Sequence, residues 1–310
     1  MGGGRFDDSK WDSYSKTTRT ATATHGAKGV YSGTHCDKDL DPKNIKIRES
    51  RDSAANPNST AIIIGLDMTG SMDTVLEQIV TKDLGVAFKE LYSRKPVVDP
   101  HICLMMFDDV VVQKEGVLQV SQFEAEVDKL TAQIGKFYLT HNGGGNSFES
   151  YHLPLYMAAT KTSIDCFEKR KKKGYLFTIG DEGVPAPLSP SQINEVFGSE
   201  AAAALDYKSI LRMAERMYHV FHIMVEEGDH MQHSGEAVKK SWRAALGERA
   251  LLLTDHTKLG EVIVAAIQRN EGASVDEVVA SWSGDTSLVV RDAIKDLQPA
   301  GTEAGGVTTL

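Results

Sequence analysis

The sequence has few cysteines, no surplus of positive charge and no apolar run long enough to cross a membrane. Its three cysteines, Cys36, Cys103 and Cys166, are an odd number without metal-binding spacing, which favours free thiols in a reducing compartment. The 34 lysines and arginines are outnumbered by 43 aspartates and glutamates, which gives a net charge of -9. This balance argues against broad electrostatic binding to nucleic acid or to an anionic membrane.

The first residues also lack the signals of export or lipidation. Residues 1–8 have no apolar core of a secretory signal, and no later run approaches the roughly eighteen residues that span a bilayer. Gly2 would suit myristoylation, but Phe6 stands where serine or threonine is expected. We therefore expect a cytoplasmic protein that has no membrane partner.

The most informative feature of the sequence is the stretch Ala61–Met72. It begins with an isoleucine-rich apolar run, which ends abruptly at Asp67. An unbroken run of this kind predicts a parallel strand that is buried on both faces. Asp67, Thr69 and Ser71 then lie in the turn after the strand, where open α/β sheets place their ligand sites. Their three hard oxygen groups predict a divalent cation: Mg²⁺, Mn²⁺ or Ca²⁺.

The same turn lacks residues that other sites require. A phosphatase of the haloacid dehalogenase type needs a second aspartate where Thr69 stands, and a serine hydrolase elbow needs glycines that frame Ser71 as Gly-x-Ser-x-Gly. A phosphate-binding loop needs a lysine that is absent here. The turn can also simply cap the next helix, but capping uses one oxygen, whereas a shared cation uses all three.

Two later segments extend this pattern. His141–Ser150 is a glycine-rich turn that opens a helix, and Tyr175–Gly183 is a short apolar strand that ends at Asp181. Together with the turn after Asp67, they resemble the three metal loops of the von Willebrand factor A domain, whose metal-ion-dependent adhesion site binds Mg²⁺ or a similar ion. The resemblance covers about residues 59–270. It is strongest to intracellular A-domain proteins of bacteria and their phages.

The resemblance implies a set of ligands around one cation. In the second loop the family commonly presents a threonine hydroxyl, whereas this chain has Asn146 with Ser147 beside it. Either oxygen suits a hard cation, so the choice between these two residues stays open. The expected metal ligands are Asp67, Thr69, Ser71, Asn146, Ser147 and Asp181. Asp108, at a strand end, and His141, beside the second loop, are the candidates for contact with a partner.

The middle of the chain alternates between strand and helix patterns, which predicts an α/β fold with a doubly wound, mostly parallel sheet flanked by helices, as in A-domain or Rossmann-like proteins. The expected parts are an extended N-terminal arm (1–58) that docks through its aromatic residues, the A-domain (59–272), extra C-terminal helices (273–298) and a disordered tail (299–310). Within the domain, Val110–Val112 predicts an antiparallel edge strand and Phe148–Arg170 a long helix.

The function that the resemblance implies is protein–protein interaction rather than catalysis. A cation held by neutral hydroxyls can accept an Asp or Glu side chain from a protein partner. Intracellular members of the family assemble with AAA+ ATPases, so a partner of that kind in a bacterial or phage assembly is expected. One alternative is a metal-dependent hydrolase, with Asp108, Glu149 or His141 as general base. Another is a structural component that forms a homo-oligomer through its arm.

Overall fold

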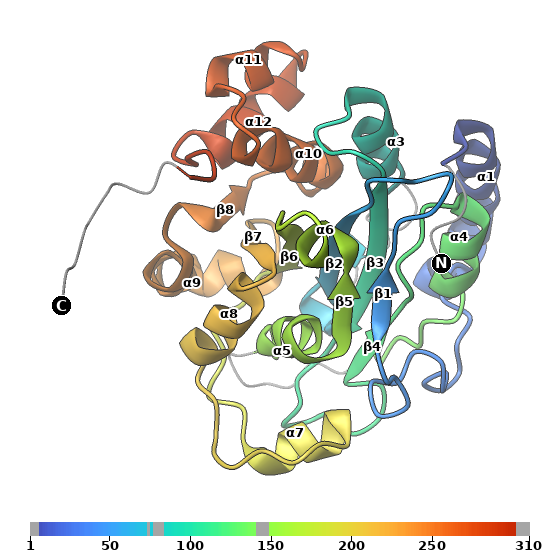
Figure 1. Ribbon diagram of the computed structural model, residues 1–310, viewed down its shortest axis with the longest axis vertical. Helices are drawn as coiled ribbons and strands as arrows, with labels where there is room; N and C mark the ends of the chain where they lie inside the picture. The colour runs from blue at the N-terminus through green and yellow to red at the C-terminus, as the bar shows by residue number, and fades with distance from the viewer. Residues whose placement is uncertain (1–5, 73–74, 77–83, 141–148, 302–310) are drawn as a thin grey trace.

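The computed structural model describes residues 6–72, 75–76, 84–140 and 149–301 (Figure 1). Its centre is a six-stranded sheet in the order β4-β3-β2-β6-β7-β8, in which only the β3–β4 pair is antiparallel. This confirms the predicted fold class, a doubly wound and mostly parallel sheet of the A-domain or Rossmann type. The strands are β2 (Thr60–Asp67), β3 (Pro100–Phe107), β4 (Leu118–Val120), β6 (Gly174–Gly180), β7 (Tyr218–Val225) and β8 (Ala250–Leu253).

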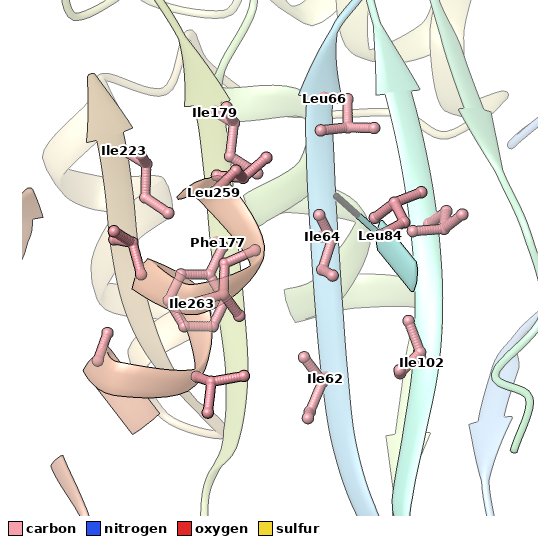
Figure 2. Packing of buried hydrophobic residues seen from close by; sticks show 14 of the residues in the cluster. Ile62, Ile64, Leu66, Leu84, Ile102, Phe177, Ile179, Ile223, Leu259 and Ile263 are labelled. Carbon is pink, nitrogen blue, oxygen red and sulfur yellow. The ribbon is translucent and has the colours of Figure 1, made fainter. Parts of the chain in front are cut away.

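The central strand β2 carries the isoleucine-rich run, and its side chains alternate between two apolar layers. Ile62 and Ile64 belong to the layer on one face of the sheet, and Ile63 belongs to the layer on the other. Figure 2 shows the first layer, where Phe177 of β6 lies beside helix α10 (Leu259–Asn270). Because both faces are covered, the strand is apolar from Ala61 to Leu66, between Thr60 and Asp67 at its two ends.

Helices cover both faces of this sheet (Figure 1). Within the described part of the chain, no helix is both long and apolar enough to cross a membrane. The face that carries Ile64 is covered by α3 (Leu84–Arg94), α4 (Val127–Ile134), α10, α11 (Val275–Ala280) and α12 (Asp285–Ile294). The opposite face is covered by α5 (His152–Lys161), α6 (Asp165–Glu168), α7 (Pro190–Phe197), α8 (Tyr207–Glu215) and α9 (Asp229–Leu246).

The expectation of an extended N-terminal arm is wrong for helix α1 (Asp8–His25). Asp7 caps this helix by accepting hydrogen bonds from the backbone of Ser9 and Lys10. Threonine hydroxyls along the helix donate to carbonyls four residues earlier, so the threonine-rich segment satisfies its side chains without leaving the helical conformation. Docking through aromatic side chains is confirmed, because Trp11 is buried with its ring centroid 5.1 Å from that of Phe88 in α3.

The long helix expected over Phe148–Arg170 is also wrong, because a short strand divides it. Strand β5 (Thr162–Ile164) separates α5 from α6 and pairs in parallel with β1 (Arg48–Ser50). Arg51 strengthens this junction through ion pairs with Glu49, Asp165 and Glu168. The pairing partner lies more than a hundred residues earlier in the chain, so the helical pattern alone did not reveal the interruption.

The antiparallel edge strand is β4 rather than the predicted Val110–Val112. Those valines lie in a turn, where the backbone N–H of Val111 donates to the Asp109 carboxylate at 2.9 Å. The side chains of Val111 and Val112 are 62% and 44% exposed, whereas Val110 is buried in the core, so only the first valine of the run packs inside the protein. The carboxylate of Asp109 therefore turns the chain before the edge strand begins.

Candidate metal site at the carboxyl edge of the sheet

The proposed first metal loop begins at the last residue of β2. Asp67 is fully buried, and its Oδ1 accepts hydrogen bonds from the backbone N–H of Thr69 at 3.0 Å and from the Thr69 hydroxyl at 2.7 Å. Thr69 is itself only 1% exposed. The chain then forms a short 3₁₀ turn over Gly70–Met72, which contains the backbone of Ser71. The first loop therefore orients a carboxylate and a hydroxyl at one point.

The third loop begins at the end of the neighbouring strand β6. Asp181 is fully buried, and its Oδ2 accepts a hydrogen bond from the backbone N–H of His230 at 2.9 Å, in the first turn of α9. In the order of the sheet, β2 and β6 are the two strands between which the direction of the crossovers reverses. Open α/β sheets place ligands at the carboxyl end of this switch point. Asp67 and Asp181 both occupy it.

Tyr151 joins the two loops from the side of α5. Its buried hydroxyl donates to Asp67 Oδ2 at 2.8 Å and accepts from the backbone N–H of Glu182 at 3.1 Å. Gly180 makes this approach possible, because a Cβ there would lie 2.2 Å from the Tyr151 hydroxyl and 2.8 Å from Asp67 Oδ2. Trp242 holds the same loop by donating its indole N–H to the Glu182 carbonyl at 2.7 Å.

Two glutamates add further carboxyl groups to this centre. Glu149 is 2% exposed and Glu182 is 7% exposed. Within the described part of the chain, the buried Oε2 atom of each has no hydrogen-bond partner. Buried polar atoms are rarely left in this state, because the lost hydration is not replaced.

Burial and neighbouring carboxylates disfavour the ionisation of Asp67, Glu149 and Glu182. Burial, followed by the charge of Asp181, raises the pKa of Asp67 to about 7. Burial, followed by the charges of Asp67 and Asp181, raises the pKa of Glu182 to about 8. Burial also raises the pKa of Glu149, with Asp67 and Glu182 contributing next. Such shifts are expected where like charges share a desolvated site, and a bound cation would reverse them.

This arrangement fits a hard divalent cation. The described donors are carboxylate and hydroxyl oxygens, which Mg²⁺, Mn²⁺ and Ca²⁺ prefer. The unpartnered glutamate oxygens offer lone pairs that the chain's own donors do not use. The structure thus brings together Asp67, Thr69 and Asp181 of the predicted ligands, whereas Asn146, Ser147 and the partner candidate His141 lie outside the described residues.

Asp108, the other partner candidate, is 1% exposed at the end of β3. Its Oδ1 accepts the backbone N–H of Asp109 at 2.6 Å, and its Oδ2 accepts the hydroxyl of Thr140. Both oxygens are therefore engaged within the chain.

Sequence reasoning treated Glu149 only as a possible base, and it missed Tyr151 and Glu182. The sequence feature that could have pointed to Glu182 as a site residue is its position directly after the predicted ligand Asp181.

A second group of metal-binding residue types lies on the surface, near the carboxyl ends of β7 and β8. Glu227, Asp255 and His256 bring their ligand atoms within 4.8 Å of one another. The Glu227 carboxylate already accepts hydrogen bonds from the backbone N–H and the Nδ1 of His256, each at 2.6 Å. The Asp255 carboxylate accepts hydrogen bonds from the backbone N–H and the hydroxyl of Thr257. These contacts explain the grouping of the three side chains by turn formation.

The fold and the site define a doubly wound α/β protein with an acidic centre at the switch point of its sheet. No protein-family model matches the chain, and no curated protein matches it. Among solved structures, it is similar to two crystal structures of the pilus adhesin SpaC from Lactobacillus rhamnosus GG, one in an open conformation. Both share 10% identity over 72% of this chain, with TM-scores of 0.46 and 0.47.

A von Willebrand factor type A structure from Catenulispora acidiphila is also similar, with 14% identity over 70% of this chain and a TM-score of 0.39. The chain covers 32% and 31% of the two SpaC chains and 44% of the Catenulispora chain. It thus spans less than half of each of these structures. The fold class given above rests on the order and direction of the strands.

Proposed function

We propose that this chain is a protein-interaction module whose binding depends on a divalent cation at the carboxyl edge of the sheet. The observation that carries the proposal is that buried Asp67 and Asp181 lie at the carboxyl ends of two adjacent central strands, where the charge of Asp181 helps to raise the pKa of Asp67. A cation relieves this repulsion and is the simplest reason for placing both carboxylates there. The proposed ligands are Asp67, Thr69, Ser71, Asp181 and either Asn146 or Ser147.

The partner is proposed to supply an aspartate or glutamate. Hydroxyl ligands are neutral, so they leave positive charge on the cation, and an incoming carboxylate forms a charge-assisted anchor at the centre of an interface. From the family resemblance, we propose an intracellular bacterial or phage assembly, with an AAA+ ATPase as the partner class. We further propose that the chain is not an enzyme, because no pattern of nucleophile and base accompanies the site.

Two measurements test this proposal. Calorimetric titration of chelator-treated protein with Mg²⁺ or Mn²⁺ should give binding that Asp67→Ala abolishes. Affinity capture should then recover a partner with the wild type in Mg²⁺, and lose it both in EDTA and with Asp67→Ala. Asp206→Ala is the matched control, because this exposed aspartate caps α8 and should leave capture unchanged.

Two results would contradict it. A partner that binds equally well in EDTA and to Asp67→Ala would show that the recognition surface lies away from the metal site. Panels of phosphoester, peptide and nucleotide substrates should show no turnover that depends on Asp67. A reproducible metal-dependent rate that disappears in Asp67→Ala would favour the hydrolase instead.

A further inference from the structure

Glu149 and Glu182 are not explained by the hydrogen bonding of the fold. Both glutamates are more than nine-tenths buried, and within the described residues the Oε2 atom of each accepts no hydrogen bond. Protonation alone would not solve this problem, because a neutral carboxyl group also needs a partner for its hydrogen. Among the described residues, the geometry therefore leaves two buried oxygen atoms at this site without a partner.

Both glutamates belong to the same centre as the predicted metal ligands. Glu182 follows Asp181, and its backbone N–H donates to the Tyr151 hydroxyl that also binds Asp67. Glu149 precedes by two residues the same Tyr151, whose hydroxyl donates to Asp67 Oδ2 at 2.8 Å, and it is 2% exposed. Tyr151 thus connects the backbone segments that carry both glutamates to the strand end that carries Asp67.

The neighbouring aspartates differ, because the fold already uses their oxygen atoms. Asp108 accepts from the backbone N–H of Asp109 and from the Thr140 hydroxyl. Asp109 accepts from the backbone N–H of Val111, which stabilises a turn. These contacts give the aspartates a structural role, so at this edge of the sheet the described carboxyl groups with an unpartnered buried oxygen are those of Glu149 and Glu182.

We propose that Glu149 and Glu182 bind the divalent cation together with Asp67 and Asp181, so that four carboxylates of the chain itself surround the ion. This inference rests on the proposed function, because the cation is the same. It adds that, until a partner binds, the two glutamates take the place on the cation that the partner's carboxylate is proposed to occupy. An acidic side chain from a partner then has to displace one of the two glutamates, which makes binding a competition between an internal and an external carboxylate.

The test is titration of chelator-treated protein with Mn²⁺ alone. Glu149→Gln and Glu182→Gln keep the shape of each side chain but remove its charge, and each should weaken Mn²⁺ binding at least about tenfold. Glu124→Gln is the matched control, because Glu124 is also 7% exposed with an unpartnered Oε2 within the described residues. The backbone of Glu124 forms an antiparallel β-bridge with Ile102, near the amino end of β3, whereas Asp67 lies level with the other end of that strand. Glu124→Gln should therefore bind Mn²⁺ like the wild type.

Water-proton relaxation by bound Mn²⁺ gives a second readout. Loss of a glutamate ligand admits water to the ion, so the relaxation rate per bound Mn²⁺ should rise in both glutamine variants and not in Glu124→Gln. If a glutamine variant does not fold, Glu149→Asp and Glu182→Asp test the same point, because they keep the charge but shorten its reach and should also weaken binding.

The outcomes separate this inference from the proposed function. Unchanged Mn²⁺ affinity and relaxation in both glutamine variants, with binding lost in Asp67→Ala, would refute the four-carboxylate centre and leave the cation site intact. Absence of Mn²⁺ binding by the wild type would overturn both. Weaker binding in Glu124→Gln equal to that in the other variants would show a general effect of buried charge and would also overturn the inference.

Discussion

Replacement of Tyr151 by phenylalanine tests whether the site is held together by a single hydroxyl. The Tyr151 ring packs edge-on against Phe107, with ring centroids 5.1 Å apart, and against Trp242 at 5.3 Å. Phenylalanine keeps these ring contacts. The substitution therefore removes only the hydroxyl, which bonds the Asp67 carboxyl group and the backbone N–H of Glu182.

The expected cost follows from the two groups that lose their partner. Each buried polar group left unsatisfied costs about 1–3 kcal/mol, and the acceptor here is a carboxyl group. We therefore expect Tyr151→Phe to lower the free energy of unfolding by about 3 kcal/mol. The measurement is urea unfolding at neutral pH in chelator, followed by circular dichroism.

A neighbouring tyrosine supplies the control. Tyr207 is 3% exposed and also packs edge-on against Trp242 at 5.3 Å, but within the described part of the chain its hydroxyl has no hydrogen-bond partner. Tyr207→Phe should leave stability unchanged or raise it by up to about 1 kcal/mol. Equal effects of the two substitutions, or a loss below about 1 kcal/mol for Tyr151→Phe, would refute the reasoning.

Two further predictions concern regions away from the metal site. Burial lowers the pKa of fully buried His101 to about 4, so between pH 6.5 and 4 the folded chain binds fewer protons than the unfolded chain and loses stability as pH falls. His101→Gln should therefore reduce the fall in the free energy of unfolding between pH 7 and pH 4.5 by up to about 3 kcal/mol, measured by urea unfolding at both pH values. If the variant lost as much stability as the wild type, the prediction would be contradicted. A Cβ at Gly85 of α3 would lie 1.8 Å from Trp11 Nε1, so Gly85→Ala should release α1 to limited proteolysis while the sheet stays folded. Gly235→Ala, whose Cβ would meet nothing closer than 3.9 Å, should instead leave proteolysis of α1 unchanged and stabilise α9 by about 0.5–1 kcal/mol.

The central sheet could be predicted because its signals are local. The run of β2 is apolar from Ala61 to Leu66, and β6 is a shorter, mostly apolar run that contains Thr178 and stops at Gly180. Strands covered on both faces are predominantly apolar, so the first carboxylate marks the place where each strand ends. Order along the chain then places both carboxylates at one edge, because successive parallel strands run in the same direction.

The errors occurred where a distant contact overrides a local pattern. The threonine-rich segment of α1 has weak helix propensity, but burial of Trp11 against α3 stabilises it as a helix. The helical pattern after Phe148 is interrupted at β5, because pairing with β1 selects an extended backbone there. Val110–Val112 has high strand propensity, yet the bonds that Asp109 makes turn the chain at the surface.

The sequence by itself determined the strand ends and the type of ligand they present, since these depend on neighbouring residues. Only the tertiary structure decided that Tyr151 binds Asp67, which is 84 residues earlier, and that Glu149 and Glu182 are buried beside the same carboxylate. Spacing along the chain does not encode such contacts, because they depend on how α5 crosses the sheet and how Gly180 lets the loops approach. For this reason the sequence predicts a cation at Asp67, whereas only the folded structure places the carboxyl groups of Glu149 and Glu182 at the same site.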